Sequence, residues 1–507
     1  MVDTVYLYPI KTVCHVLFFM KFYNSLSKIT ESFTTISGKE VIMYVCGLTP
    51  YDSAHIGHTR TYVAFDSIKR YFISKGYSVY HIQNITDVDD KIIKRAKEAG
   101  EDPIKLTERH HREALLLFNE LAIIPATVYP KVTEHIPQII SLIQKLIEKK
   151  IAYETKTGIY YRVGSFKKYG ALSGQKLDEI KAGARIEVDE TKENAEDFAL
   201  WKKTNGEIIE FDSPFGKGRP GWHIECSAMA YAYAKGTLDI HGGARDLIFP
   251  HHENEIAQSE PVQGLFSRFW LHTGFLTVDG EKMSKSLGNF ITVKDALKQF
   301  TPQGLRLFFI QTHYRSPMDY SEEHLRAAEE TVERIFNARG LIDEVLENKK
   351  DKKNTDFRKI TNDQITAIYQ ALEHDFDTPD AFASFFALIR EINVHVMHDL
   401  VDTAQLEQLR ETFDQILYIF GLVEKKEAVD SKFNEISTLQ NWIRDELGFD
   451  WEKQADTAEE KLMQIINARD TLRKQKKYKE ADQIRAKLLE IGIILEGKEK
   501  GKRWKFK

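Results

Sequence analysis

Apolar and polar positions in the first part of the chain follow the order strand, helix, strand. Residues 40–46 (EVIMYVC) form a short apolar run that Gly47 ends, as is typical of a buried strand followed by a tight turn. Residues 57–75 then carry apolar side chains at helical spacing before the stop signal Gly76, and residues 77–85 alternate as a second strand. This order predicts a parallel, right-handed crossover unit.

The pattern is interrupted and then resumes. Residues 129–220 contain a predicted helix at 135–149, short strand-like pieces and a charged, glycine-bearing region, and they are interpreted as a connective insertion. Strand and helix signals return in residues 221–300. We therefore expect residues 20–128 and 221–300 to be the two halves of one Rossmann-type, nucleotide-binding parallel α/β sheet.

Beyond residue 300 the strand signals vanish and long amphipathic helices take over, for example at 322–348. Residues 301–423 are therefore expected to form an all-α helical bundle. Residues 424–460 are charged and polar enough to be a linker or an irregular helix, and residues 461–507 are expected to form a small closing unit.

Composition is ordinary for a globular protein of several domains, with 42% hydrophobic and 29% charged residues. The formal net charge of −5 hides an uneven distribution, because residues 471–507 contain thirteen Lys and Arg but only five Asp and Glu. A basic tail on an acidic body is typical of an RNA-contacting appendage, and a merely solvated charged tail is the alternative.

The cysteines and the N-terminus bear on the compartment. Cys14, Cys46 and Cys226 are too few and too widely spaced for a disulfide framework, which favours a reducing, cytoplasmic environment. The apolar run that ends at Met20 is much shorter than a membrane span of about 20 residues, and no other segment is predicted to cross a membrane. We interpret residues 1–19 as an over-extended translation start.

The strongest local motif is His55-Ile56-Gly57-His58, directly before the predicted first helix. A helix N-terminus offers unpaired N–H groups and partial positive charge to a phosphate, and Gly57 permits close approach of a nucleotide. Two imidazoles can add hydrogen bonds as charge develops on the phosphoryl group. In isolation, these four residues favour the alternative of two surface histidines beside a turn.

A second motif, Lys282-Met283-Ser284-Lys285-Ser286, is flanked by glycines and is expected to form a loop that closes over ATP. Lys282 and Lys285 could neutralise the β- and γ-phosphates as pyrophosphate leaves. An exposed basic turn is the alternative for this loop alone. The occurrence of both motifs, in this order on one parallel α/β chain, favours the phosphate-binding interpretation.

The two motifs resemble the HIGH and KMSKS signatures of the class I aminoacyl-tRNA synthetases, which they match without substitution. The resemblance implies a Rossmann catalytic core that forms an aminoacyl-adenylate from ATP and an amino acid. The aminoacyl group then passes to the terminal adenosine of tRNA. It also implies catalytic, ATP-binding roles for His55, His58, Lys282 and Lys285, with Gly57 in the ATP site.

A second constellation indicates metal chemistry: Cys46, Cys226, His251 and Glu255. His251 and Glu255 stand at i and i+4, so that both side chains leave one face of a helix together, as two ligands of one zinc ion must. The cysteines lie far apart in sequence, so only the fold can bring them together. The alternatives are small buried hydrophobic cysteines and an exposed helical pair.

Taken together, these residues resemble the cysteinyl-tRNA synthetase family, as do the blocks YVCGLTPYDSAHIGH, ITDVDDKI, DFALWK, FGKGRPGWHIECSAM, DIHGGARDLIFPHHENEIAQSE and EKMSKSLGNF. The resemblance implies that the four residues bind one Zn²⁺ that recognises the thiolate of L-cysteine. ATP, with Mg²⁺, and tRNA(Cys) would be the other substrates of a monomer. It assigns to the substrate pocket Gly47, Thr49, Thr86, Trp222, His241 and Asp246, for which ordinary fold-stabilising roles are the alternative.

The tail resembles the small anticodon-reading unit of the same family, through Arg473, Tyr478 and Asp482. Arginine can hydrogen-bond a base edge, and an aromatic ring can stack on an unpaired base. Two other functions stay open from the sequence. One is a related zinc enzyme that couples activated cysteine to an amino-sugar and lacks the anticodon-side region; the other is a non-catalytic RNA-binding paralogue.

Overall fold

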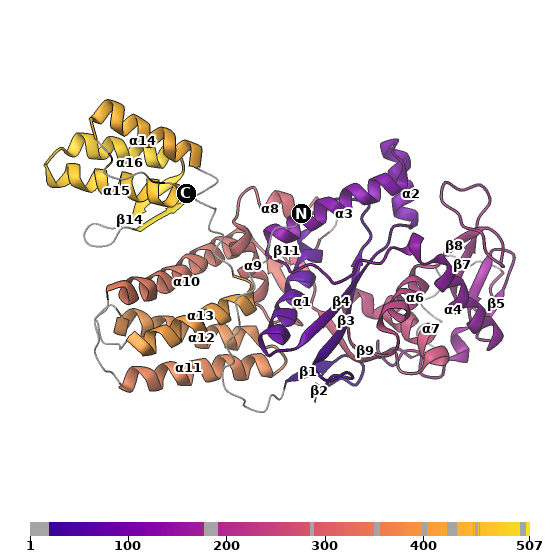
Figure 1. The fold of residues 1–507 in the computed structure, drawn as a ribbon. Coiled ribbons are helices and arrows are strands. Elements are labelled where there is room, and N and C mark those ends of the chain that lie inside the picture. The colour runs from indigo at the N-terminus through magenta and orange to yellow at the C-terminus, as the bar shows by residue number, and fades with distance from the viewer. Residues whose placement is uncertain are drawn as a thin grey trace. The chain divides into compact units, whose positions relative to one another are not determined.

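The computed structural model describes residues 20–176, 191–283, 288–348, 355–396, 403–422, 433–449, 451, 455, 457–496 and 503–506. The predicted translation start at residues 1–19 lies outside these residues. The chain forms two compact units, Met1–Leu422 and Val423–Lys507 (Figure 1). No helix among the described residues is long and apolar enough to cross a membrane.

A four-stranded parallel sheet forms the centre of the first unit (Figure 1). Its strands are β3 (Glu40–Leu48), β4 (Ser78–Ile85), β9 (Leu238–Ala244) and β10 (Ser267–Thr273). The order is β10-β9-β3-β4, so the chain leaves β3 toward one side of the sheet and β9 toward the other. The carboxyl ends of β3 and β9 therefore form a topological switch point, where open α/β sheets bind ligands.

Helices cover both faces of this sheet, which explains why β3 is a continuous apolar run. Val41, Met43 and Val45 pack with the side chains of α1 (Ile56–Ser74). On the other face, Tyr44 and Cys46 pack against α6 (Trp222–Ala234) and α7 (Glu253–Gln263). Alternation along one strand thus directs Cys46 toward α6 and α7.

The segment between the two halves of the sheet has its own core. It contains α4 (Ile136–Glu148) and a four-stranded antiparallel sheet in the order β5-β6-β7-β8. The strands are β5 (Ala152–Glu154), β6 (Gly158–Tyr161), β7 (Phe198–Lys203) and β8 (Gly218–Pro220). Before it, α2 (Asp90–Ala99) and α3 (Pro103–Glu120) follow β4.

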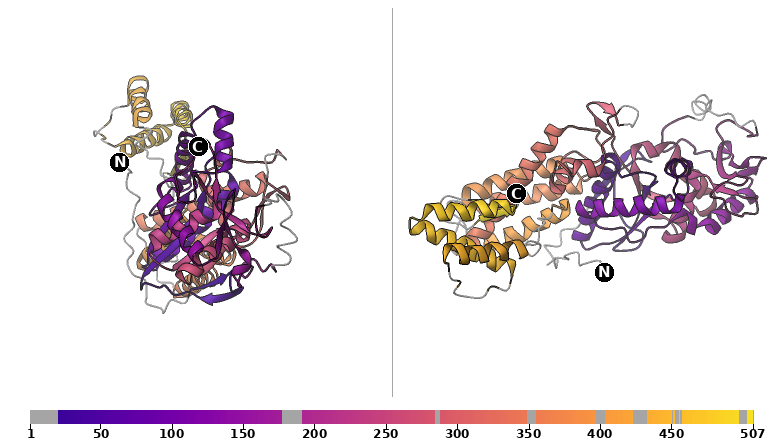
Figure 2. Two further views of the ribbon diagram at one scale, coloured as in Figure 1. Left: turned by 90° about the vertical axis from the view of Figure 1, so that its right-hand side faces the viewer. Right: turned by 90° about the horizontal axis from the view of Figure 1, so that it is seen from above.

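Long helices follow the sheet and pack side by side in Figures 1 and 2. They are α9 (Pro302–Ile310), α10 (Glu322–Asn348), α11 (Thr355–Glu373), α12 (Thr378–Val396) and α13 (Thr403–Phe420). Their core is continuous with that under α1. The predicted fold class, a class I synthetase α/β core with an insertion followed by a helical bundle, is confirmed.

A buried ion cluster joins α1 to the end of the bundle. Arg306 of α9 is 1% exposed and contacts the carboxylate of Asp66, which also accepts a 2.7 Å hydrogen bond from Arg70. The Arg306 guanidinium donates further to the carbonyls of Phe420 at 2.6 Å and Leu121 at 2.9 Å. One guanidinium therefore connects α1, the end of α3 and the end of α13.

The second unit differs from the sequence expectation at its start. The sequence predicts a linker or irregular helix over residues 424–460, whereas Phe433–Leu447 form the regular helix α14. Its buried residues Ile436, Leu439 and Ile443 occupy a narrow apolar stripe among charged neighbours, and that stripe completes a core with the next two helices. A unit that started at residue 461 would lack helix α14 and the part of the core that its side chains form.

The rest of the second unit consists of α15 (Ala458–Lys474), α16 (Tyr478–Glu490) and an antiparallel pair, β14 (Ile493–Glu496) and β15 (Arg503–Phe506). Helix α15 begins with a capping box, in which the side chain of Thr457 accepts from the N–H of Glu460 and the side chain of Glu460 accepts from the N–H of Thr457.

Candidate functional site

The first signature caps helix α1. His55 is the N-cap residue, and its Nδ1 accepts a 3.3 Å hydrogen bond from the backbone N–H of His58. The two imidazoles contact each other, with ring centroids 3.6 Å apart and ring planes tilted by 30°. Burial, and then the positive charges of His55 and Lys91, hold the pKa of His58 well below its usual value. His58 is therefore neutral at pH 7, beside the exposed N–H dipoles of the helix.

The segments around the two signatures lie against each other. The N–H of Val293 donates to the carbonyl of Ala54 at 2.9 Å, and the N–H of Ile56 donates to the carbonyl of Ile291 at 3.2 Å. A Cβ atom on Gly57 would lie 3.1 Å from ring atoms of His55 and 3.2 Å from the Cε of Met283, so Gly57 lies close to both signatures. The segment that follows the second signature thus returns to the start of α1.

The two lysines of the second signature are only partly described. The backbone of Lys282 belongs to β12 (Glu281–Lys282), which pairs with β11 (Leu276–Val278). The side chain of Lys282 and the whole of Lys285 lie outside the described residues. Their predicted contacts with ATP stay predictions.

Four buried side chains converge behind the carboxyl edge of the sheet. Cys46 comes from β3, Cys226 from α6, His251 from the short helical segment Ile248–His252, and Glu255 from α7. Their candidate ligand atoms all lie within 4.8 Å of one another. Two sulfurs, an imidazole nitrogen and a carboxylate oxygen are a donor set that tetrahedral zinc accepts.

The contact between His251 and Glu255 is close, as their i, i+4 spacing predicts. The backbone is kinked at Phe249, which is extended, but this kink precedes both residues, and His252 and Glu253 between them have helical backbone angles. The Nε2 of His251 is 3.0 Å from Glu255 Oε1, an oxygen that also lies 3.8 Å from the Sγ of Cys46. The i, i+4 spacing therefore brings the two groups together.

The pKa values of these groups depend on one another. Burial alone would raise the pKa of Glu255, but the charges of His241 and His251 and their hydrogen bonds lower it to about 2. Burial alone would lower the pKa of His251, whereas the negative charges of Glu255 and Cys226 raise it to about 10. A hydrogen bond from Cys46 lowers the pKa of Cys226 to about 6, while burial raises the pKa of Cys46. A cation entering the cluster would therefore find negative charge in place and would displace the proton of His251.

A second possible ligand set overlaps the first. His252 Nε2 lies 3.2 Å from Cys46 Sγ, and His241 Nε2 lies 2.8 Å from Glu255 Oε2. Together with Cys46 and Glu255, these two histidines also form a group within 4.8 Å. Zinc favours the set with Cys226, because that set offers two thiolates instead of one.

Further histidines surround the cluster, and the sequence analysis did not single them out. His223 Nδ1 lies 2.9 Å from His251 Nδ1, and His252 Nδ1 lies 2.8 Å from His272 Nε2. His272 Nδ1 in turn lies 2.8 Å from the hydroxyl of Ser25. Such outer hydrogen bonds fix the orientation and tautomer of a ligating ring. Adjacency was the available signal, since His223 and His252 directly follow predicted site residues.

Part of the predicted substrate pocket lies at the ends of β3 and β4. The N–H of Gly47 donates to the Oδ1 of Asn84 at 2.8 Å, and a Cβ atom at Gly47 would lie 1.6 Å from the carbonyl oxygen of Asn84. The buried Thr86 accepts from the Nδ2 of Asn84 at 3.2 Å. Thr49 is half-buried just after β3. Asn84 therefore links the two strand ends.

The other predicted pocket residues differ in their surroundings. The ring of Trp222, 41% exposed, lies 4.5 Å from that of His251, and the buried ring of His241 stacks on Trp270 at 4.5 Å. Asp246 lies in the exposed turn Arg245–Leu247. Among the described residues, no hydrogen bond or ion pair joins Asp246 to the cluster.

In the second unit, the three predicted anticodon residues are neighbours. Arg473 Nη1 lies 4.0 Å from Asp482 Oδ1, and its guanidinium carbon lies 6.0 Å from the ring centre of Tyr478. Tyr478, the first residue of α16, is 55% exposed. An exposed aromatic ring beside a guanidinium can stack on an unpaired base.

Comparison with known proteins gives concordant matches. Residues 32–330 match the family described as tRNA synthetases class I (C) catalytic domain, and residues 367–424 match the DALR domain. The chain is 44% identical over 493 residues to a cysteine–tRNA ligase of Thermococcus gammatolerans, covering 96% of this chain and 99% of that protein. It is also 44% identical over 492 residues to a cysteine–tRNA ligase of Carboxydothermus hydrogenoformans, covering 96% and 100%.

Among solved structures, a Mycobacterium tuberculosis methionyl-tRNA synthetase in complex with methionyl-adenylate superposes with a TM-score of 0.57. The match covers 75% of this chain and 89% of that one at 15% identity. At this identity the likeness shows a shared fold alone.

Proposed function

The chain belongs to the cysteine–tRNA ligase family, an enzyme family of class I synthetases, and from this premise we propose how its residues divide the reaction. L-cysteine and ATP react to give cysteinyl-adenylate and pyrophosphate, and cysteine then passes to the 3′-terminal adenosine of tRNA(Cys). The observation that carries this proposal is the buried cluster of Cys46, Cys226, His251 and Glu255 at the switch point of the sheet.

The donor set of this cluster fits Zn²⁺, one ion per chain. Two sulfurs, one of them with a pKa lowered to about 6 in Cys226, together with His251 and Glu255 match the preferences of zinc. A zinc ion held there would supply a soft Lewis-acid position for the substrate thiolate, whereas the harder hydroxyl of serine binds such a position poorly. Recognition of a bonded group can reject an analogue that lacks it by roughly 10⁴-fold.

Around the amino acid, the chain contributes groups that orient it. Trp222 and His241 flank the cluster, and Gly47, Thr49 and Thr86 come from the adjoining strand ends. Thr86 supports the pocket through Asn84, and the absence of a side chain at Gly47 permits the close approach of the two strands. Asp246 is proposed to approach the substrate from its exposed turn.

At the ATP end, helix α1 presents its N-terminus with His55 and His58, and Gly57 leaves room beside them. These groups would donate hydrogen bonds to the phosphates, with Mg²⁺ bound to the nucleotide. Lys282 and Lys285 are proposed to neutralise the β- and γ-phosphates as pyrophosphate leaves.

The tRNA is proposed to contact both units, with Arg473, Tyr478 and Asp482 at the anticodon. We propose the domain limits predicted above for the catalytic halves and the insertion, a monomeric state, and action in the cytoplasm. The amino-sugar-coupling alternative is disfavoured, because the DALR match lies in the anticodon-side region that such an enzyme lacks.

Cysteine-dependent exchange of pyrophosphate into ATP tests the proposal directly. We expect exchange with L-cysteine, loss of exchange after prolonged chelation, and recovery when zinc is restored. Serine should support exchange roughly 10⁴-fold less well. Equal exchange with serine would contradict recognition through the metal, and exchange with methionine would contradict the amino acid assignment.

Removal of residues 423–507 separates adenylate formation from tRNA recognition. These residues form a compact unit with its own core, so the first unit should keep its fold. We expect cysteine-dependent exchange to persist, while the catalytic efficiency of tRNA charging falls by at least about tenfold, as loss of a stacked base contact implies. Unchanged charging by the shortened chain would show that the second unit does not read the tRNA.

A further inference from the structure

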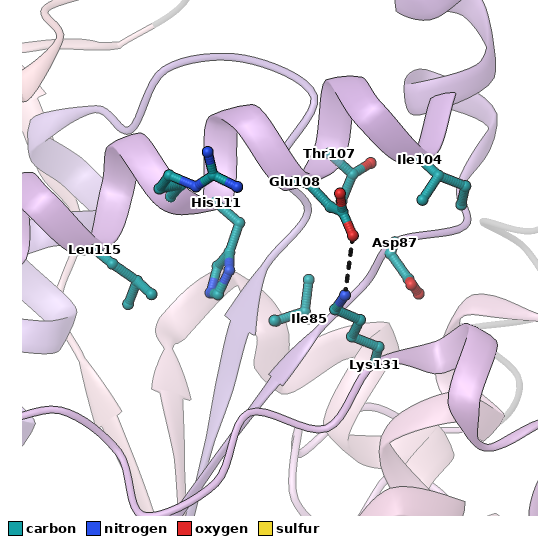
Figure 3. A pocket seen from close by; sticks show the side chains of 9 residues that line it. Ile85, Asp87, Ile104, Thr107, Glu108, His111, Leu115 and Lys131 are labelled. Carbon is teal, nitrogen blue, oxygen red and sulfur yellow. Dashed lines mark hydrogen bonds and ion pairs between the residues drawn. The ribbon is translucent and has the colours of Figure 1, made fainter. Parts of the chain in front are cut away.

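A cavity of about 290 Å³ lies outside the cluster described above, between helix α3 and the end of strand β4 (Figure 3). Ile104 and Leu115 of α3 and Ile85 of β4 give it apolar walls. Lys131 forms the far side, since its backbone runs parallel to Ile85 at the edge of the sheet. This volume is just below the roughly 300 to 1,000 Å³ of small-molecule sites, so it suits one small group such as a single base.

Some charged groups of the lining make hydrogen bonds or ion pairs and others do not. Both oxygens of Asp87 accept hydrogen bonds from Thr133, at 2.6 Å from its hydroxyl and 3.1 Å from its N–H. Glu108 pairs with Lys131 at 3.4 Å, as the dashed line in Figure 3 shows. Two acidic and two basic side chains make the lining formally neutral. A neutral lining disfavours a polyanion such as a nucleoside triphosphate.

Two other side chains of the lining, those of His111 and Arg112, make no such contacts with the described residues. Neither His111 nor Arg112 makes a hydrogen bond or an ion pair with any residue in the described part of the chain, and the ring of His111 only meets the edge of Tyr129. Figure 3 shows the His111 ring directed from α3 toward the strand. Burial, and then the charge of Lys131, lower the pKa of His111 to about 4, so the neutral ring offers both a donor and an acceptor at pH 7.

The cavity adjoins the catalytic edge of the sheet. Its residues Ile85 and Asp87 directly flank Thr86, whose hydroxyl accepts from Asn84 and lies within hydrogen-bonding reach of Glu225, the neighbour of Cys226. Ligands of open α/β sheets bind outside the carboxyl ends of the strands, so the nucleotides that precede a terminal adenosine bound at this edge can reach the end of a neighbouring strand. The cavity lies at the end of the outermost strand of the sheet, β4.

We propose that this cavity binds one unpaired nucleotide of the tRNA acceptor end, upstream of the terminal adenosine. The base would lie between the apolar walls with its polar edge against His111, and its single phosphate would meet the guanidinium of Arg112. A nucleotide unit within a chain carries one negative charge, and Arg112 is the lining cation that makes no ion pair with a described residue, whereas Lys131 pairs with Glu108. The inference rests on the proposed function, because it concerns only the tRNA step.

The test compares full-length tRNA(Cys) with the same tRNA lacking its unpaired 3′ nucleotides, using the complete protein loaded with zinc. Dissociation constants are measured for the unaltered chain, His111→Leu and Arg112→Gln. Lys105→Gln is the matched control, since Lys105 is an exposed cation on the same helix that does not line the cavity. We expect trimming to weaken binding by about tenfold for the unaltered chain and the control. Each cavity variant should bind intact tRNA more weakly than the unaltered chain and should lose clearly less affinity on trimming, because only the contact of the terminal adenosine remains to be lost.

Cysteine-dependent ATP–pyrophosphate exchange, which needs no tRNA, should be unchanged in Arg112→Gln, whose substituted side chain is exposed. Absence of exchange in the unaltered chain would contradict the proposed function itself, so failure of the proposed function can be told apart from failure of this inference. Three results would overturn the inference: equal losses for trimmed and intact tRNA, an equal loss with Lys105→Gln, or no loss with either cavity variant. A change in exchange without a change in tRNA affinity would instead identify a small-molecule site and would also overturn it.

Discussion

Replacement of Cys226 by serine is expected to abolish zinc retention and cysteine activation together. Serine keeps the size of the side chain but removes the thiolate that zinc prefers, and its hydroxyl does not ionise near neutral pH. Loss of an outer partner of a metal ligand already reduces affinity or activity by about 10- to 100-fold, so loss of a ligand should exceed about 100-fold. The measurements are metal content per chain after gel filtration and cysteine-dependent pyrophosphate exchange.

The same variant distinguishes the two overlapping ligand sets. If Cys46, His241, His252 and Glu255 hold the metal, Cys226→Ser should retain a full complement of zinc, and that outcome would contradict our choice. Ala230→Ser is the matched control, because Ala230 lies one turn further along α6 and is buried in the same apolar cluster. It introduces the same hydroxyl without removing a ligand, so zinc content and exchange should persist.

The sequence predicts the local parts of the fold well, because they depend on local signals. The apolar run ended by Gly47, the helical spacing after it and the stop at Gly76 predict β3 and α1 to within two residues. The pairing of β3 with β9 is different, since it joins segments almost two hundred residues apart. The return of strand and helix signals after residue 220 predicts that the two halves share one sheet, but which strands are neighbours depends on contacts that no local pattern contains.

The region after the bundle shows the opposite case. Helix α14 buries only a narrow stripe of Ile436, Leu439 and Ile443, so its composition is close to that of a linker. The partner surface that makes the stripe a core lies on α15 and α16, which no local pattern reveals. Tertiary packing, which decides most helical stability, explains why the local pattern left a linker or an irregular helix as the expectation for this segment.

The candidate metal site is predictable as a set of residue types but not as an arrangement. Cys46, Cys226, His251 and Glu255 could be named from their motifs, whereas the outer contacts of His251 with His223 depend on the way α6 packs against α7. The i, i+4 spacing of His251 and Glu255 predicts their proximity, and the two groups lie 3.0 Å apart, because both residues follow the kink at the extended residue Phe249.

Replacement of Arg306 by methionine should give the largest loss of stability. Methionine fills much of the same space but leaves the buried Asp66 paired with Arg70 alone and removes the donors to the carbonyls of Phe420 and Leu121. Breaking a buried ion pair by removing one partner costs about 3 to 5 kcal/mol. Urea unfolding at pH 7 should therefore show a markedly lower midpoint for the transition of the first unit, which contains Arg306.

The pH dependence of this loss follows from Asp66. Burial alone would raise the pKa of Asp66, but the charges of Arg70 and Arg306 lower it below its ordinary value. A carboxylate with a lowered pKa in the folded state stabilises above its unfolded pKa of about 3.9, and that contribution is lost as the pH falls through the folded value. The difference between Arg306→Met and the unaltered chain should thus be full at pH 7 and shrink below about pH 4.

Arg410→Met is the matched control for this prediction. Arg410 pairs with Asp343 at 2.9 Å within the same bundle, but the two side chains are 48% and 43% exposed. Exposed ion pairs contribute about 0 to 1 kcal/mol to stability, because water screens both charges and because holding two long side chains in one geometry costs conformational entropy. The control should therefore unfold close to the unaltered midpoint. Both variants replace an ion-paired arginine by methionine and differ mainly in whether that arginine is buried. Equal midpoints would therefore show that the buried guanidinium of Arg306 does not hold α1 to the bundle.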